Sequence, residues 1–340
     1  MDWNCAPSCI GSLPHTDPVK AVDLVLEKLK TMPFWPQLPC RGFRENMYNQ
    51  FACYLPGTRV DEDRKKLTVD LDSYDPEDIY TRIVTEDVAS FALPKESFAG
   101  FHELMSRELP ATTKALKGQV TGPISLGLQV VDRNAKSIIY DEAYFEIVRK
   151  NLNLMARWQE GELRKKFPQT TIFLDEPYLS LIGTPFASVP PADVVSYIND
   201  TLSGLEGAKG IHCCANTDWP LVMSTDADLL SFDAYDYGHT MVLYPEEVER
   251  FLKRGGCLSW GAIPNNEETV AGETVPSLVE RLEKLFRSLG DKGVDRELIL
   301  KNSILTPQCG LGGLDEATSG KVMDLLNGVS EALRSKYSLE

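Results

Sequence analysis

The chain has 340 residues, of which 43% are hydrophobic and 25% are charged, and its formal net charge is −15. This composition is ordinary for a globular protein with a full core, while the negative charge disfavours partners that require a basic face, namely nucleic acid and anionic membrane surfaces. No stretch approaches the roughly 18 apolar residues of a membrane-spanning helix, and residues 1–15 lack the basic segment and the apolar run of a signal peptide.

Short apolar runs alternate with amphipathic segments along the whole chain. The runs predicted as strands are 8–14, 34–39, 116–123, 170–177, 209–216, 228–235, 256–264 and 303–310. Apolar residues recur between them at the three- and four-residue spacing of a buried helix face. The segments predicted as helices are 17–30, 144–167, 191–205, 245–255 and 277–290. No linker or low-complexity tract divides the chain, so we expect one domain over residues 1–340.

Eight strand candidates alternating with helices predict an α/β protein with a (β/α)8 TIM barrel. The competing fold is an open doubly wound sheet, which favours a glycine-rich phosphate turn after an early strand. The nearest match, "GLGG" at 310–313, lacks that spacing. Residues 54–73 are too polar for a barrel strand, and we interpret them as a β-hairpin inserted after the second strand.

Polar side chains gather where the predicted strands end. Catalytic residues of a barrel stand at the carboxyl ends of its strands, and a purely structural barrel has no need for polar residues on one rim. The residues at these positions are Ser12, Gln37, Thr121, Asp175 with Glu176, His212 with Cys214, Asp233, Trp260 and Cys309.

Three of these residues have the chemistry of a metal site. His212 and Cys214 are two residues apart, so they face the same side of an extended strand. Cys309 ends the last predicted strand, and a closed barrel brings that strand back across the mouth. One imidazole and two thiolates are three ligands for a tetrahedral zinc ion with one open position. Cys213 faces the opposite way, and without a signal peptide the remaining cysteines indicate buried thiols in a reducing cytoplasm.

The charge of this ligand set favours one kind of chemistry. Two thiolates neutralise a divalent cation, which makes it a weak Lewis acid but a good holder of a third thiolate. A thiolate kept deprotonated at neutral pH is a nucleophile. We therefore expect alkyl transfer to a thiol, whereas hydrolysis favours a more acidic, histidine-rich zinc.

In this pattern the chain resembles the catalytic, C-terminal half of cobalamin-independent methionine synthase, within the superfamily that includes uroporphyrinogen decarboxylase. The motifs that carry the resemblance are "IGSLPHT", "VTGPIS", "LDEP", "IHCC", "DADLLSFD" and "TPQCGL", in family order from residue 10 to residue 311. The resemblance implies that His212, Cys214 and Cys309 bind Zn2+ and that Ser12 and Asp175 hold the amino-acid end of homocysteine. It places the family's acidic residue of the sixth strand, which can ligate zinc, at Asp233, and so implies catalytic roles for Asp175 and Asp233.

Two departures from the family bear on the methyl donor. The N-terminal barrel that helps the family's long enzymes bind methylfolate is absent from this sequence, and the seventh strand, "LSWGAIP", has no histidine. Because release of a methyl group from a folate amine requires a general acid, these absences favour a methylcorrinoid donor, as in short core methionine synthases. The corrinoid is expected free or on a separate protein. Methylfolate-dependent synthesis of methionine is an alternative.

The acceptor is inferred from the charge of the predicted rim. Asp175, Glu176 and Glu45 supply carboxylates that suit the ammonium group of homocysteine, whereas coenzyme M carries a sulfonate and requires a cationic pocket. Transfer to coenzyme M or another thiol is an alternative. A decarboxylase of the uroporphyrinogen type is a less favoured alternative, because its reaction does not use the three metal ligands. A non-catalytic accessory protein that uses zinc only structurally is another, but a structural zinc ion normally has four protein ligands.

Overall fold

The computed structural model describes residues 2–339. Its main sheet is parallel and curled, with seven strands in the order β1-β9-β8-β7-β6-β5-β4, and β2 and β3 form a separate pair. The strands are β1 (Ala6–Pro7), β2 (Thr58–Asp61), β3 (Lys66–Val69), β4 (Leu116–Thr121), β5 (Thr170–Asp175), β6 (Ala208–Cys213), β7 (Leu229–Phe232), β8 (Cys257–Ile263) and β9 (Ser303–Pro307).

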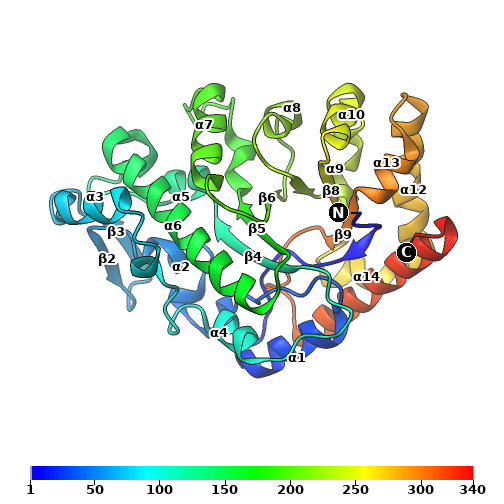
Figure 1. Ribbon diagram of the computed structural model, residues 1–340, viewed down its shortest axis with the longest axis horizontal. Helices are drawn as coiled ribbons and strands as arrows, with labels where there is room; N and C mark the ends of the chain where they lie inside the picture. Colours follow the sequence, from blue (N-terminus) through cyan, green and yellow to red (C-terminus); the bar gives the residue numbers. More distant parts are fainter. Residues whose placement is uncertain (1, 340) are drawn as a thin grey trace.

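Helices surround the curled sheet on its outer side (Figure 1). The α-helices are α1 (Pro18–Lys28), α2 (Asn49–Ala52), α3 (Pro76–Val84), α4 (Ala99–Ser106), α5 (Pro123–Gln129), α6 (Glu142–Lys166), α7 (Pro191–Leu202), α8 (Trp219–Met223), α9 (Ala234–Met241), α10 (Pro245–Lys253), α11 (Glu267–Gly272), α12 (Val275–Asp291), α13 (Arg296–Lys301) and α14 (Glu316–Tyr337). Short 3-10 helices are η1 (Pro39–Arg41), η2 (Phe43–Glu45), η3 (Val88–Phe91), η4 (Ile138–Tyr140) and η5 (Pro177–Leu181). None of the helices within residues 2–339 is both long and apolar enough to cross a membrane.

The prediction from sequence is confirmed for the strands from residue 116 onward and for the five predicted helices, within a few residues at each end. The first two strands differ. The first strand, β1, lies at Ala6–Pro7, just before the predicted run 8–14, and neither that run nor the run 34–39 forms a regular strand. Pro33, Pro36 and Pro39 explain the second difference, because proline has no N–H to donate to a sheet ladder.

The segment around Phe34 nevertheless links the two edges of the sheet. Phe34 forms a parallel bridge with Lys117 of β4, and Gln37 forms one with Ser12, just after β1. The backbone N–H of Gln37 donates to the carbonyl of Gly11, and that of Leu13 donates to the carbonyl of Gln37, each at 2.9 Å. The arrangement is TIM-barrel-like and carries Ser12 and Gln37 to the same rim.

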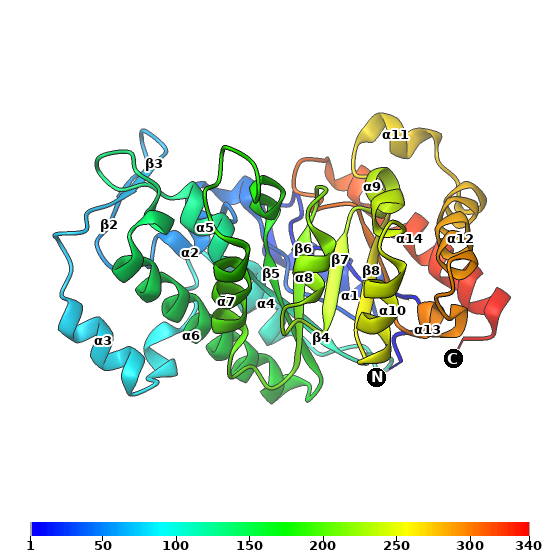
Figure 2. The ribbon, with the colours of Figure 1, turned by 90° about the horizontal axis from the view of Figure 1, so that it is seen from above.

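Residues 58–69 form an antiparallel hairpin in which Thr58 pairs with Val69 and Asp61 with Lys66. The hairpin lies beside the barrel, at the end of the molecule opposite to α12 and α14 (Figure 2). That it is an insertion relative to the family stays a prediction.

Alternation along the strands decides which side chains face the interior. On β5 and β6, Phe173 and Gly210 point inward, where the Phe173 ring occupies the space that a Cβ at Gly210 would require, at 2.5 Å. Asp175 and His212 lie two residues further along the same strands, are register partners, and therefore face the interior at its carboxyl end. Cys213 packs in the layer between sheet and helices, as predicted.

Candidate metal centre

His212, Cys214 and Cys309 come together at the carboxyl ends of β6 and β9. One ligand atom from each residue lies within 4.8 Å of the other two. The fold thus brings the three predicted ligands together from positions nearly a hundred residues apart. That zinc occupies the cluster is a proposal.

The imidazole of His212 is held so that one of its ring nitrogens is free to bind a metal ion. Its Nδ1 hydrogen-bonds to the hydroxyl of Ser231 at 3.0 Å on the neighbouring strand β7. Its Nε2 is buried and has no hydrogen-bond partner within the described residues. A buried nitrogen left unpaired is unfavourable, and a second-shell hydrogen bond at the opposite nitrogen is typical of metal-binding histidines. The residues therefore fit a metal ion at Nε2.

The two thiols lie close enough to hydrogen-bond with each other. Hydrogen bonding with the Cys309 thiol lowers the pKa of Cys214, with His212 adding to the effect. The same pairing, together with burial, raises the pKa of Cys309. The pairing thus favours loss of the first proton, and a bound cation would displace the second.

The three residues line a cavity of about 370 Å³ at the barrel rim. Its other lining residues are Ile10, Ser12, Gln37, Pro39, Glu45, Asn46, Met47, Asp175, Pro177, Gly310, Gly312 and Gly313. Among these described residues there is no lysine or arginine, and the charged side chains are two carboxylates. The cavity therefore suits a small ligand that carries a thiol and a positive charge.

Both carboxylates of the cavity keep one buried oxygen without a partner. Asp175 Oδ1 and Glu45 Oε2 have none within the described residues, while Glu45 Oε1 accepts a hydrogen bond from Arg41 Nε at 2.6 Å. Burial raises the pKa of Asp175 to about 6, against the opposing effect of Lys117. Burial likewise raises the pKa of Glu45, against Arg41. A cationic donor group bound in this cavity would supply hydrogen bonds that these oxygens lack.

Ser12 lies at the same cavity, next to the loop that follows Cys309. Its hydroxyl accepts a hydrogen bond from the N–H of Gly312 at 3.2 Å. A Cβ added at Gly310 would lie 2.1 Å from the Ser12 hydroxyl. The glycines of "CGLGG" therefore allow this loop to pack against Ser12 and fix the position of its hydroxyl.

Glu176, predicted to bind substrate, does not line the cavity. Its carboxylate turns toward the start of α5, where it accepts hydrogen bonds from the N–H groups of Ile124 and Ser125 at 2.9 and 2.8 Å and from the Ser125 hydroxyl at 2.6 Å. Adjacent residues on a strand face opposite sides, so Asp175 and Glu176 cannot both face the interior. The structure gives Glu176 the role of holding α5.

Asp233, predicted to be catalytic and a possible ligand, lies outside the three-residue cluster. Its carboxylate caps α9 through the N–H of Asp236 at 2.9 Å. Both of its oxygens also accept from Gln308 Nε2, at 3.1 and 3.0 Å. Its oxygens are thus engaged by the protein, and it fixes Gln308, the residue before Cys309.

Sequence reasoning missed three residues that support the site, namely Ser231, Gln308 and Lys117. No sequence pattern indicates Ser231, because its position next to His212 follows from strand register. Gln308 could have been found, because it immediately precedes the predicted ligand Cys309. Lys117 is buried inside the barrel, where its ammonium donates to the carbonyl of Ile10 and, at 3.2 Å, to Gln119 Oε1. Burial lowers the pKa of Lys117 to about 8, against the opposing charge of Asp175.

Comparison with known proteins gives likenesses to solved structures alone. No protein-family model matches the sequence, and no curated protein matches it. A B12-independent methionine synthase from Shewanella sp. W3-18-1, solved in complex with selenomethionine, is similar with a TM-score of 0.50 and 20% identity over 66% of this chain. The match spans 63% of that enzyme's chain. At this identity the likeness shows the fold alone.

The comparison overturns the predicted methyl donor. The structural neighbour is a B12-independent enzyme, which conflicts with a methylcorrinoid donor and with a separate corrinoid partner, and agrees with the methylfolate alternative. The prediction rested on two absences, the histidine of the seventh strand and the N-terminal barrel of the family's long enzymes. The absence of one histidine does not exclude a methylfolate donor, because a proton can reach the leaving nitrogen from water or from another acidic group.

Proposed function

We propose that this chain is a zinc-dependent methyltransferase that methylates the thiol of homocysteine to give methionine, with a methylfolate as donor. The observation that carries the proposal is one cavity holding an unpaired imidazole nitrogen and two thiols beside two carboxylates with free oxygens. The thiol end of homocysteine suits the first group, and its ammonium end suits the second.

In this proposal His212, Cys214 and Cys309 hold the metal, and Ser231 fixes the tautomer of His212. Bound zinc would keep the substrate sulfur deprotonated at neutral pH. Asp175 and Glu45 bind the ammonium group, and Ser12 offers its hydroxyl to the carboxylate end. These contacts orient the sulfur toward the cavity mouth, since the amino-acid end is held at the opposite side.

The reaction is a displacement at carbon. A sulfur lone pair forms the new S–C bond as the C–N bond of the donor breaks, and the donor nitrogen keeps that electron pair. A proton is then required at this nitrogen, because an amide-like or amine anion is a poor leaving group. Asp175 and Glu45 are engaged with the substrate ammonium group in this proposal, so the proton reaches the donor nitrogen from water at the cavity mouth.

Coenzyme M is disfavoured as acceptor by the charge of the site. Its sulfonate would face Asp175 and Glu45, and within the described residues no cation lines the cavity. Like charges brought together in a desolvated pocket repel strongly. An ammonium-bearing thiol has the complementary charge.

The test is methyl transfer by zinc-loaded protein with homocysteine and methylfolate, followed by detection of methionine. Parallel reactions replace methylfolate by methylcobalamin, or homocysteine by coenzyme M. Methionine from methylfolate supports the proposal. Transfer only from methylcobalamin contradicts the donor, and preferred methylation of coenzyme M contradicts the acceptor. Zinc-edge X-ray absorption should show one additional sulfur neighbour when homocysteine is added.

A further inference from the structure

A second cavity, here called the α3 cavity, lies where α3 packs against α6, apart from the metal centre. Its volume is about 420 Å³, within the roughly 300–1,000 Å³ typical of small-molecule sites. It shares no lining residue with the metal cavity. The lining residues are Tyr54, Pro56, Tyr74, Asp75, Asp78, Ile79, Arg82, Ser90, Phe91, Ala92, Pro94, Asn151 and Met155. A molecule bound here would leave the proposed homocysteine site open.

The buried part of the α3 cavity contains an amide whose oxygen has no hydrogen-bond donor. Asn151, on α6, is 3% exposed, and its Oδ1 has no partner within the described residues. Ile79, Phe91 and Met155 are lining residues that are also buried, so this part of the cavity is otherwise apolar. A carbonyl oxygen left without a donor in such surroundings is unfavourable. A ligand that brings an O–H or N–H group to Asn151 would satisfy it.

Two tyrosine rings in the walls of the α3 cavity are fixed by contacts with the rest of the protein. The hydroxyls of Tyr54 and Ser97 hydrogen-bond to each other at 2.7 Å. The rings of Tyr74 and Tyr144 have centroids 5.6 Å apart and planes inclined by 62°. The Tyr144 hydroxyl in turn donates to the carbonyl of Pro56, another lining residue, at 2.6 Å. The tyrosine rings in the lining offer contact area to an aromatic ligand.

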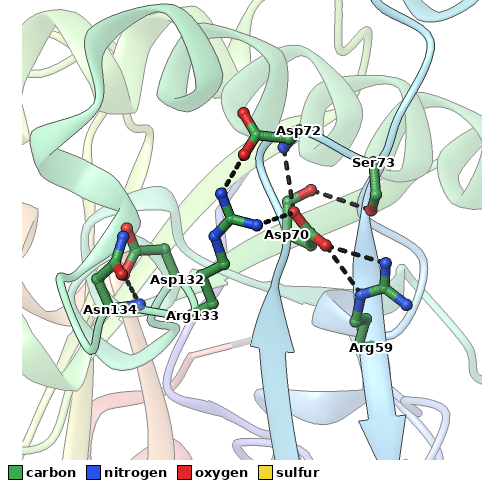
Figure 3. A network of polar contacts seen from close by, with 7 residues as sticks. All are labelled: Arg59, Asp70, Asp72, Ser73, Asp132, Arg133 and Asn134. Carbon is green, nitrogen blue, oxygen red and sulfur yellow. Dashed lines mark hydrogen bonds and ion pairs between the residues drawn. The ribbon is translucent and has the colours of Figure 1, made fainter.

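A network of polar contacts holds the turn that leads from β3 into α3 (Figure 3). Asp70, directly after β3, accepts from Arg59 at 3.1 and 2.9 Å and lies 3.6 Å from Arg133. Arg133 also pairs with Asp72, and the Ser73 hydroxyl donates to the carbonyl of Asp70 at 3.1 Å. The lining residues that follow this turn therefore have a defined position before any ligand binds.

The exposed part of the α3 cavity carries an unpaired negative charge. Asp75 and Asp78 are exposed lining residues. Asp78 pairs with Arg82 at 2.7 Å, whereas no cation pairs with Asp75 within residues 2–339. Asp75 Oδ1 caps α3 by accepting from the N–H of Glu77 at 3.0 Å. The remaining charge of Asp75 favours a cationic group at this end of the cavity.

We propose that the α3 cavity binds a small aromatic amine that carries a hydroxyl or N–H group on its ring. The ring lies against Tyr54 and Tyr74, the ring substituent donates to Asn151 Oδ1, and the ammonium group faces Asp75. This arrangement satisfies the buried amide oxygen and the unpaired carboxylate with one ligand. The inference does not rest on the proposed function, because no residue of the metal cavity takes part in it.

Three probes test the contacts separately, with isothermal titration calorimetry on the full chain as the measurement. Tyramine has the ring, the phenolic hydroxyl and the ammonium group. Phenethylamine lacks the hydroxyl, and 3-(4-hydroxyphenyl)propionate has a carboxylate in place of the ammonium group. We expect tyramine to bind about fivefold or more tightly than phenethylamine, because only tyramine donates to the buried oxygen. The propionate should bind most weakly, because its charge and that of Asp75 have the same sign.

Two variants and one control assign these contacts to residues. Asn151→Leu removes the unpaired amide, so its melting temperature should equal or exceed that of the wild type. It should bind tyramine about fivefold or more weakly and phenethylamine as the wild type does. Asp75→Asn keeps the helix cap, since asparagine caps as well as aspartate, and should weaken both amines about threefold or more, with a smaller effect at high salt. The control Glu77→Gln makes the same change of charge on α3 outside the lining and should bind like the wild type.

Several outcomes would overturn the inference. Wild-type protein that binds none of the probes has no such site, and equal affinity of the wild type and the folded N151L variant for tyramine would remove Asn151 from it. A marked fall in the melting temperature of N151L would show that the amide supports the fold instead of a ligand. Equal effects of D75N and E77Q would reduce the role of Asp75 to general surface charge. Formation of methionine without binding of tyramine would contradict this inference alone, and binding of tyramine without formation of methionine would contradict only the proposed function.

Discussion

The Nδ1 atom of His212 on β6 lies 3.0 Å from the hydroxyl of Ser231 on β7. The two residues are register partners on adjacent parallel strands, so strand pairing itself brings them together. This contact leaves Nε2 as the nitrogen that faces Cys214 and Cys309. A neutral imidazole can accept metal at only one nitrogen once the other carries the proton.

Replacing Ser231 by alanine should weaken zinc binding by about 10- to 100-fold, because His212 loses the partner that fixes its tautomer and ring orientation. Competition with a chromogenic chelator measures this affinity. The matched control is Ser259→Ala on β8, the register partner of Ser231, whose buried hydroxyl has no partner within the described residues. Equal zinc affinity in S231A and wild type would contradict the assignment of Ser231.

Replacing Cys309 by serine should abolish stoichiometric zinc binding, since two ligands cannot hold the ion against competing chelators. Cys213→Ser is the comparison, because this neighbouring cysteine packs away from the cavity and donates to the carbonyl of Ala215 at 3.4 Å. Metal analysis of the dialysed proteins should find zinc in C213S and none in C309S. Retention of zinc by C309S would remove Cys309 from the site.

Neutralising either carboxylate of the cavity should weaken binding of the amino-acid substrate. Glu45→Gln and Asp175→Asn should each raise the KM for homocysteine by about tenfold or more, since a hydrogen bond to a charged group contributes roughly 1.5–3 kcal/mol. Steady-state kinetics at saturating donor measures the effect. Glu176→Gln is the contrast, because its carboxylate holds α5 and we expect a lower melting temperature with less change in KM. A KM effect in E176Q as large as in D175N would contradict this division of roles.

Gly310→Ala should displace the Ser12 hydroxyl, which lies 2.1 Å from the position of the added methyl group. Overpacking of this kind costs about 1–3 kcal/mol of stability, and the KM for homocysteine should rise because Ser12 moves. Gly313→Ala in the same loop meets nothing within 4 Å and should change neither quantity substantially. Chemical denaturation and steady-state kinetics on both variants provide the check.

Lys117 should make the free energy of unfolding depend on pH in the alkaline range. Burial lowers its pKa from 10.5 to about 8 in the folded protein, so between these values the unfolded chain binds more protons and the free energy of unfolding rises with pH. The full effect is on the order of 3 kcal/mol. Lys117→Met should remove this component, which urea unfolding at pH 7.5, 9 and 10.5 would measure. Parallel pH profiles for the variant and the wild type would show that Lys117 is not buried as a cation.

The sequence by itself determined the order of the main-sheet strands from residue 116, the facing of Cys213, and the three candidate ligands. These features follow from local periodicity and from the rule that barrel strands end at one rim. The tertiary structure decided what depends on pairing between distant segments. Register placed Ser231 behind His212, the prolines around Phe34 replaced a regular strand by isolated bridges, and packing turned Glu176 and Asp233 to helix ends. A residue's type states which bonds it can form, but only its spatial neighbours determine which of those bonds remain free for a ligand.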